Sequence, residues 1–485
     1  MKRVTTLLIL LLFTPIAQGA VLEGALENII DGDTISMQSN TVRLEDIDMA
    51  KYSHRCKDYS IRLYAPWRRI TKVESSFNMS THSLPSAVVL GGWVTGLWTA
   101  RALAQEGIRV AVVHTHSDDF AGSSRHVART IRLRPAPVNP AQLAERLLSQ
   151  GGGFTGGILI PTSDFALEAL SRFRDDLSCK FRVHVPAWEI VRRFLDKSET
   201  ATLAREVGVP RPTTFGLIGA GASDAVDAPV PFVVKPLDSR RFSQAFGRKL
   251  WIVKCPEKLR RCVEKLRMAG LKASVEALIP GGDDKSYNYT AYVDTNGQVK
   301  AEFLIHKLRK YPPRYGIGSV ITPLLDKATA TRLSEATLAM VRRVGYFGLV
   351  SAEFKQDARD GRLLLMEINA RCSFVQQLAW KHGVNYPALL YREAAFGEVP
   401  YLRATPGPQV LIHLKNDLLG ALFFRASEGL TWKEYLGPYR YDNKCYAVWC
   451  WRDPWPFFVE WSHMTGLVLR RARMLGRRSG NSWRA

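Results

Sequence analysis

The sequence predicts an α/β protein with more than one domain. Its 485 residues exceed what one hydrophobic core organises, and its composition, 46% hydrophobic and 23% charged, is that of ordinary folded proteins. Two patterns indicate the fold class: a strand, glycine turn, helix and strand in residues 87–113, and paired strands with intervening helices in residues 196–397. We therefore expect two or three domains, each with its own core.

The first twenty residues have the pattern of an export signal. Lys2 and Arg3 precede an apolar run over residues 7–13, and small residues follow at Ala17 and Gly19. The run is shorter than the roughly 20 residues that a membrane-spanning helix needs. Residues 21–70 then alternate as β-strands do, before a serine-rich linker.

A new domain begins at residue 84. Residues 87–90 form a buried-strand pattern that continues into Gly91-Gly92 and a helix, and residues 109–113 form the next strand. Glycines let the backbone turn tightly here, so this order predicts a βαβ unit. Residues 157–161 are a further buried strand, and we place the domain at 84–195.

Residues 196–400 form the next predicted domain, which contains two hairpins. In the first, residues 231–235 and 250–253 bracket a polar loop of small residues. In the second, residues 348–354 and 363–368 bracket a turn at Asp360-Gly361. The remaining residues, 401–485, are aromatic-rich and basic, and we expect them to form a helical extension.

Acidic and amide side chains gather on the second hairpin. Side chains alternate along a strand, so Glu367 and Asn369 share a face, and the partner strand can place Glu353 beside them. Such oxygen ligands suit Mg²⁺. The alternative is a pair of solvated acids, but Glu367 follows four apolar residues, and an acid on a buried strand needs a reason.

Lysines flank the polar loop of the first hairpin. Lys235 ends one strand and Lys249 begins the next, with Ser239, Ser243 and Gly247 between them. Two ammonium groups beside a small-residue loop can hold phosphates while backbone N–H groups close over them. A lysine at a strand end is otherwise a solvated cap, and the carboxylates downstream favour the phosphate role.

These motifs, in this order and spacing, resemble the ATP-grasp superfamily. The resemblance covers residues 84–400 and is closest to its carboxylate–amine ligases, the D-aspartate ligase-like branch, which residues 159–164 and 307–313 favour. It implies a Rossmann-like pre-ATP-grasp domain followed by ATP-grasp α+β subdomains, with the nucleotide between them. The motifs are Asp196-Lys197, residues 207–210, residues 232–236, residues 279–281, Glu353 and residues 367–371.

The resemblance also implies roles for single residues. ATP is the implied nucleotide, and Mg²⁺, with Mn²⁺ as the alternative, is the implied ion. Arg371 would neutralise the transferred phosphoryl group. Three sets complete the site: Lys197, Lys235 and Lys249 on the phosphates, Glu276 and Leu278 in the hinge strand at the adenine, and Glu353, Glu367 and Asn369 on the metal.

Two positions depart from the superfamily pattern. The hinge glutamate is replaced by Ala277, and the nearest acid, Glu276, would face the opposite way in a regular strand. Ala370 occupies a position that is usually proline. A basic patch in residues 306–311 contains Arg309, which we predict to act on the substrate carboxylate or acyl phosphate. A solvated basic face is the alternative.

The N-terminal segment has a resemblance of its own, to the thermonuclease (staphylococcal nuclease-like) family. It implies that Asp33 and Asp48 bind Ca²⁺ and that Arg43 contacts phosphate, whereas Lys51 replaces the family's glutamate. About forty residues cannot close a barrel, so we expect a truncated β-barrel-like segment without nuclease activity.

Net charge points to anionic partners. The formal charge is +22, and six arginines follow one another without an intervening acid: Arg470, Arg471, Arg473, Arg477, Arg478 and Arg484. Such a run is usually a solvated or disordered end; the alternative that we predict is a peripheral membrane contact, with no specific nucleic acid. The seven scattered cysteines predict neither a zinc site nor a disulfide framework. A homodimer is the default expectation for an oligomer.

The predicted function is therefore an ATP-dependent ligase that activates a small-molecule carboxylate as an acyl phosphate and passes it to an amine, such as an amino acid. The export-like leader conflicts with a need for ATP, and we expect the catalytic portion to be cytoplasmic. Two alternatives stay open: a non-catalytic nucleotide-binding accessory protein, and a secreted nuclease.

Overall fold

The computed structural model describes residues 84–149, 154–221 and 227–463, together with the backbone of short strands between residues 19 and 66. The chain forms two compact units, Met1–Ser83 and Leu84–Ala485. The predicted export signal, Asp33, Asp48, Lys51 and the arginine-rich tail lie outside the described residues. The strands of the first unit are β1 (Gly19–Leu22), β2 (Leu26–Asp31), β3 (Thr34–Met37), β4 (Asn40–Arg43) and β5 (Leu63–Pro66).

In the first unit β2, β3 and β4 form an antiparallel meander, and β1 pairs with β5. Arg43 is the last residue of β4. The strands agree with the alternation in the sequence, but these residues alone do not assign the segment to a nuclease family.

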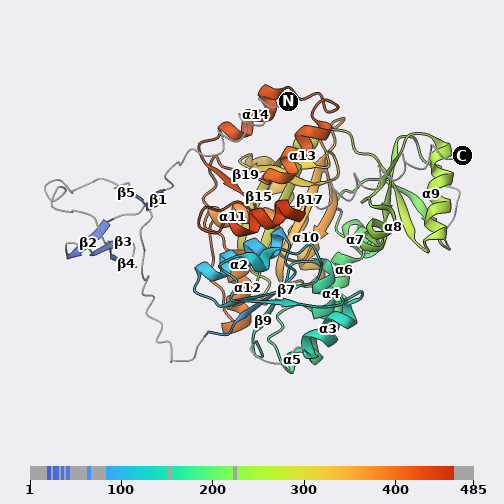
Figure 1. Cartoon of the computed structure of the whole chain (residues 1–485). Coiled ribbons are helices and arrows are strands. Elements are labelled where there is room, and N and C mark those ends of the chain that lie inside the picture. The colour runs from blue at the N-terminus through green and yellow to red at the C-terminus, as the bar shows by residue number, and fades with distance from the viewer. Residues whose placement is uncertain are drawn as a thin grey trace, which may run out of the picture. The chain divides into compact units, whose positions relative to one another are not determined.

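The second unit opens with a four-stranded parallel sheet in the order β8-β7-β6-β9. The predicted βαβ unit is present: β6 is followed by α2 and β7 (Figure 1). A Cβ on Gly96 would lie 2.0 Å from the Gly91 carbonyl oxygen, so only glycine lets α2 pack this closely on the turn. The elements are β6 (Ala87–Leu90), α2 (Val94–Gln105), β7 (Val110–His114), β8 (Arg129–Arg132), α3 (Pro140–Ser149), β9 (Ile158–Pro161), α4 (Asp164–Arg172), α5 (Arg174–Ser178) and α6 (Trp188–Leu195).

A small antiparallel sheet, in the order β10-β13-β11-β12, follows helix α7. The hairpin partners β11 and β12 are confirmed, but the predicted loop between them is wrong, because most of it is helix α8. Phe242 and Phe246, one helical turn apart, pack on Trp251 and hold that helix. The elements are α7 (Lys197–Glu206), β10 (Thr214–Gly219), β11 (Phe232–Pro236), α8 (Ser239–Phe246), β12 (Trp251–Val253), α9 (Pro256–Met268) and β13 (Lys272–Ala277).

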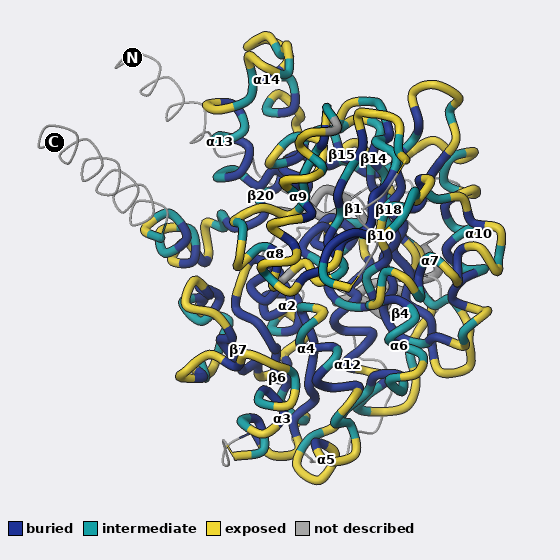
Figure 2. The backbone as a smooth tube through the Cα atoms, turned by 90° about the vertical axis from the view of Figure 1, so that its right-hand side faces the viewer, coloured by how far each residue is buried: buried dark blue, intermediate teal, exposed yellow. Residues whose placement is uncertain are grey.

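The largest sheet has seven strands in the order β18-β17-β14-β15-β16-β19-β20. The predicted hairpin of β17 and β18 is confirmed by their antiparallel register. One face of the sheet packs on α10, and Figure 2 shows the strands as mostly buried. The elements are β14 (Ser286–Val293), β15 (Val299–Tyr311), β16 (Ile317–Pro323), α10 (Lys327–Val344), β17 (Gly348–Gln356), β18 (Leu363–Asn369), α11 (Gln377–Lys381), α12 (Tyr386–Phe396), β19 (Val410–Ile412) and β20 (Lys444–Tyr446).

The C-terminal residues are more integrated than a helical extension, because β19 and β20 complete the large sheet. Helices α13 (Leu414–Phe424) and α14 (Trp432–Leu436) lie between these strands in sequence. Asp453, only 1% exposed, then accepts hydrogen bonds from Arg101 Nε (2.9 Å), Ser124 Oγ (2.6 Å) and the Arg125 backbone N–H (3.0 Å). The C-terminal segment is therefore tied to the parallel sheet.

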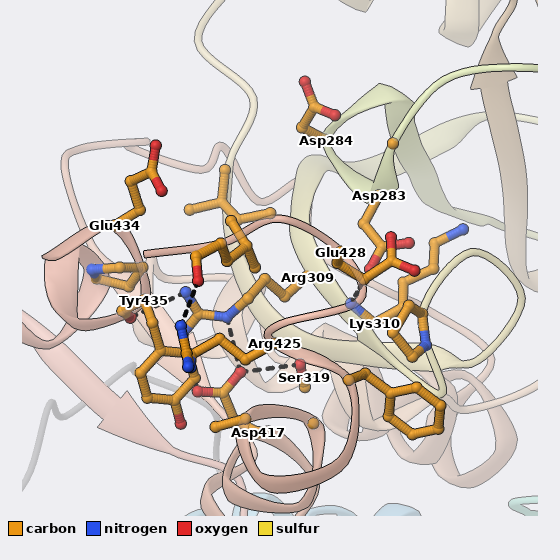
Figure 3. A pocket seen from close by; sticks show the side chains of 18 residues that line it. Asp283, Asp284, Arg309, Lys310, Ser319, Asp417, Arg425, Glu428, Glu434 and Tyr435 are labelled. Carbon is orange, nitrogen blue, oxygen red and sulfur yellow. Dashed lines mark hydrogen bonds and ion pairs between the residues drawn. The ribbon is translucent and has the colours of Figure 1, made fainter. Parts of the chain in front are cut away.

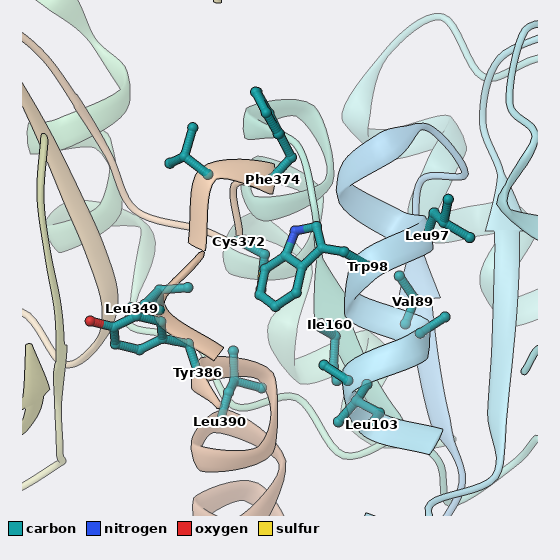
Figure 4. Packing of buried hydrophobic residues seen from close by; sticks show 14 of the residues in the cluster. Val89, Leu97, Trp98, Leu103, Ile160, Leu349, Cys372, Phe374, Tyr386 and Leu390 are labelled. Atoms are coloured by element: carbon teal, nitrogen blue, oxygen red, sulfur yellow. The ribbon is translucent and has the colours of Figure 1, made fainter. Parts of the chain in front are cut away.

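The parallel sheet and the large sheet share one hydrophobic core. Trp98 of α2 is fully buried beside Cys372 and Phe374, which follow β18, and Tyr386 of α12 lies in the same cluster (Figure 4). This packing fixes the segment after β18 against the parallel sheet. Within the described part of the chain, no helix is both long and apolar enough to span a membrane.

Candidate active site

Two carboxylates lie side by side on one face of the large sheet. Glu353 of β17 and Glu367 of β18 are direct cross-strand partners, and Ser351 pairs with Asn369. The residues between them in sequence, such as Ala352 and Ile368, point into the core on the other face. The strand pairing thus brings all three predicted metal ligands onto one polar face.

Two buried lysines of β15 hold the Glu353 carboxylate. Lys307 Nζ lies 2.5 Å from Oε2, and Lys310 Nζ lies 3.4 Å from Oε1. Burial alone would raise the pKa of Glu353, but the two ammonium charges outweigh it and lower the pKa to about 2. Glu353 is therefore charged throughout the physiological range. The sequence placed both lysines only in a general basic patch.

Arg371 connects the metal-ligand strand to the parallel sheet. Its Nε donates to Asp164 Oδ1 at 2.7 Å, and its Nη2 donates to Asn369 Oδ1 at 3.0 Å. Burial would lower the pKa of Arg371, but Asp164 raises it, so the guanidinium stays protonated. Asp164 belongs to the first turn of α4, immediately after β9. No role was predicted for Asp164 from the sequence, although a polar residue just after a buried strand is a usable signal.

Lys235 of the small sheet reaches the large sheet. Its Nζ donates to the Met366 carbonyl oxygen in β18 at 2.8 Å and lies 3.8 Å from Glu276 Oε2. Cross-strand register pairs Lys235 with Ser274 and Val233 with Glu276, so Lys235 and Glu276 share one face, opposite the core residue Val275. As expected, Glu276 points to the opposite face of the strand from Ala277. That face also carries Lys235.

Lys197 joins this group from the first residue of α7. Asp196 caps the helix by accepting from the Ser198 and Glu199 backbone N–H groups. Lys197 Nζ donates to the Pro236 carbonyl oxygen and, at 2.9 Å, to Ser239 Oγ. Burial, followed by the nearby charge of Lys235, lowers the pKa of Lys197 to about 8.

Lys355 is a further cation of this face, and the sequence pattern predicted no role for it. It stands two residues after Glu353 on β17, and its Nζ donates to the Ile279 carbonyl oxygen at 2.9 Å. Burial and the charge of Lys310 lower its pKa to about 8. Because Ile279 follows β13, Lys355 is a second link between the small and large sheets.

Three further residues were predicted for the site: Lys249, Leu278 and Arg309. Lys249 is exposed just before β12, after helix α8, and Leu278 is half-buried after β13. Arg309 turns toward the C-terminal segment: its Nε and Nη2 each lie 2.8 Å from the Asp417 carboxylate, and its Nη1 donates to the Tyr435 carbonyl oxygen at 3.0 Å. These bonds occupy the guanidinium, so Arg309 is not available to a substrate in this arrangement.

The contacts of Arg309 form one wall of a cavity of about 410 Å³. Figure 3 shows Arg309 and Ser319 converging on Asp417, with Asp283 and Lys310 at another side. Asp283 accepts from the Lys310 backbone N–H at 2.8 Å. The cavity therefore adjoins the strand that carries the lysines on Glu353, while its own polar groups bond one another.

The residues present suit a magnesium ion. Like charges directly opposite each other on neighbouring strands destabilise a sheet. Glu353 and Glu367 are nevertheless direct cross-strand partners, on the same face as the amide oxygen of Asn369. Among the described residues no cluster of three or more His, Cys, Asp or Glu side chains could hold a metal. Two carboxylates and an amide suffice for Mg²⁺, which keeps several waters and substrate phosphate oxygens in its shell.

No protein-family model matches the chain. D-aspartate ligase from Enterococcus faecium (strain Aus0004) is 25% identical over 260 residues, which cover 52% of this chain and 61% of that relative. The match thus spans less than two thirds of the relative's length.

Two solved structures share the architecture. Biotin carboxylase from Campylobacter jejuni, in complex with a βγ-ATP ligand, matches with a TM-score of 0.52 at 17% identity, over 66% of this chain and 73% of that one. L-amino acid ligase from Bacillus licheniformis matches with a TM-score of 0.51 at 16% identity, over 65% and 75%. At identities of 17% and 16%, the two matches show the fold alone. Over the part of the chain that these structures match, the predicted fold is confirmed: a Rossmann-like domain followed by ATP-grasp subdomains.

Proposed function

We propose that the chain is an ATP-dependent carboxylate–amine ligase. The observation that carries the proposal is the meeting of opposite charges between two sheets. Lys197 and Lys235 come from the small-sheet side, Glu353 and Glu367 come from the large sheet, and the bond from Lys235 to the Met366 carbonyl oxygen joins the sides. Cations for phosphates and carboxylates for a metal are what phosphoryl transfer from a nucleotide requires.

Each side chain has a proposed task. Lys197 and Lys235 bind phosphate oxygens of ATP, because both ammonium groups lie on the small-sheet side of the site. Arg371, oriented by Asp164, faces the charge that develops on the transferred phosphoryl group and the acyl oxygen. Lys307 and Lys310 keep Glu353 ionised and in place. Glu276, held by Ser274 Oγ at 2.8 Å, is the acid available to the adenine side.

Glu353, Glu367 and Asn369 would hold Mg²⁺ or Mn²⁺. When bound, the ion neutralises phosphate charge and orients the transferred group. In the proposed reaction the substrate carboxylate oxygen attacks the γ-phosphorus of ATP, and ADP leaves. An amine nitrogen then attacks the acyl carbon, the C–O bond to phosphate breaks, and an amide, inorganic phosphate and a proton are released.

The relative supports an amino-acid-like substrate. The E. faecium protein is a D-aspartate ligase, so an acidic amino acid as the carboxylate and an amino compound as acceptor are the first candidates for this chain. We further propose that the catalytic portion works in the cytoplasm, where ATP is present, as a homodimer, and that its functional boundaries are residues 84–195, 196–400 and 401–485.

A non-catalytic nucleotide-binding protein is the second candidate. The observation that favours it is the pair of salt bridges from Lys307 and Lys310 to Glu353, because these lysines compete with a metal ion for the same carboxylate. On that alternative, ATP binds without turnover and Glu367 is dispensable.

ADP release separates the two candidates. The full chain is assayed with Mg²⁺, ATP and a pool of D- and L-amino acids, beside Glu367→Gln and the matched control Glu398→Gln, whose carboxylate is exposed on the surface. A ligase gives amino-acid-dependent ADP release that Glu367→Gln abolishes and Glu398→Gln retains. Nucleotide binding without any release, in wild type and both variants, supports the non-catalytic protein.

A further inference from the structure

Three large aromatic side chains stand exposed near the C-terminal end of the described chain. Trp451 is 63% exposed, Trp455 66% and Phe458 51%, and we call them the aromatic patch. The rings form one cluster: Trp449 lies 4.9 Å from Trp451 and 6.3 Å from Phe458, and Trp455 lies 6.0 Å from Phe458, between ring centroids. Adjacent exposed aromatic side chains mark an interaction surface more often than scattered ones do.

The aromatic patch belongs to a segment that packs against the core. Residues 455–463 are helical; Pro456 and Glu460, one turn apart, are buried, and the partly buried Phe457 and Val459 pack against the core shared by the two sheets. Trp461 packs against Phe457 with ring centroids 5.6 Å apart and the ring planes tilted by 49°. The exposed rings are therefore presented outward by a packed helix rather than left over from a loose end.

The exposed charges of residues 449–463, which carry the patch, are positive. Both acids of residues 449–463 are internal: Asp453 is 1% exposed in its bonds to Arg101 and Ser124, and Glu460 is 2% exposed beside Lys415. The cations are external: Arg452 is exposed, and the exposed Arg125 donates to its carbonyl oxygen at 3.3 Å. Directly beyond, residues 464–485 contain six arginines and no acid.

We propose that the aromatic patch, together with the exposed Arg125 and Arg452, forms a surface that docks on an anionic phospholipid membrane. Tryptophan and phenylalanine rings settle at the boundary between headgroups and acyl chains, and arginines beside them are attracted to anionic headgroups. A surface for nucleic acid would need ring faces on which successive bases can stack. Here the rings meet edge to face, with interplanar angles of 74°, 85° and 88°, so they pack on one another and do not form such a platform. The proposal is independent of the ligase activity.

Vesicle co-sedimentation of the full chain tests the surface. Phosphatidylcholine vesicles with and without phosphatidylglycerol are compared at low and high salt, for wild type and for Trp451→Ala/Trp455→Ala/Phe458→Ala. Wild type binds the mixed vesicles, binding falls as salt rises, and the triple variant loses at least about tenfold in partitioning. Phe396→Ala, which removes a ring 55% exposed at the end of α12, is the matched control and binds as wild type does.

A second variant tests the charge. Arg125→Gln/Arg452→Gln weakens binding by about fivefold for each arginine, on mixed vesicles only. All chains keep residues 1–83, including the apolar run of the leader, so differences between them report the C-terminal surface. Equal binding by all variants, or equal binding to uncharged vesicles, overturns the proposal. So does retention of RNA, with no vesicle binding, that the arginine variant loses.

Discussion

Lys197 should make nucleotide binding depend on pH in a range where lysines ordinarily do not titrate. The lysine ordinarily has a pKa of 10.5, and burial together with the charge of Lys235 lowers it to about 8. A lysine is charged below its pKa and neutral above it. About nine tenths of Lys197 is therefore charged near pH 7, and roughly one tenth near pH 9.

The magnitude follows from these populations. If only the charged form gives the phosphate its charge-assisted hydrogen bond, the apparent Kd rises by the inverse of the competent fraction, about ninefold from pH 7 to pH 9. Lys197→Arg keeps its charge over this range, so its Kd should stay flat. Lys197→Met should bind weakly at both pH values.

Isothermal titration calorimetry with ADP and Mg²⁺ measures this dependence, with Lys327→Met as the control, because Lys327 is exposed on α10, which packs on the opposite face of the large sheet. A decline in affinity of the same size in wild type and Lys197→Arg would refute the role of Lys197 and move the titration to another group. A flat wild-type profile would show that the nucleotide does not contact this ammonium.

Two further predictions concern the bonds that hold the site together. Asp164→Asn removes the charge that orients Arg371 and should lower kcat about tenfold. Because the pair is half-exposed, the free energy of unfolding should change by less than about 1 kcal/mol. An unchanged kcat at saturating substrate would contradict the positioning role. Asp453→Asn leaves Arg101 buried without its charge partner and should cost about 3–5 kcal/mol, seen as a lower urea midpoint and earlier proteolysis of the C-terminal segment, whereas exposed Asp442→Asn should match wild type.

Local pattern predicted much of the fold. The strand, glycine and helix order at residues 87–113 and the hairpin of β17 and β18 are where expected, since short-range periodicity and turn residues decide them. Helix α8 was missed because Ser239, Ser243 and Gly247 suggested a loop. Its actual signals were Asp238 as N-cap, Phe242 and Phe246 one turn apart, and Gly247 as a left-handed C-terminal residue.

Long-range partners were beyond sequence patterns. Alternation correctly put Glu353, Glu367 and Asn369 on one face, but it could not show that Lys307 and Lys310 converge on Glu353. The partner of Arg371, Asp164, lies 207 residues away, and that of Arg309, Asp417, lies 108 away. For the same reason the C-terminal strands β19 and β20, three residues each, escaped detection.

Trapping of the activated acid with hydroxylamine tests the central claim most directly. The full chain is incubated with Mg²⁺, ATP, an amino-acid pool and hydroxylamine, and hydroxamate is measured beside ADP. An acyl-phosphate ligase yields hydroxamate that requires both ATP and an acid, in step with ADP, and Glu367→Gln yields none. ADP release without hydroxamate, or hydroxamate that persists in Glu367→Gln, would contradict the account.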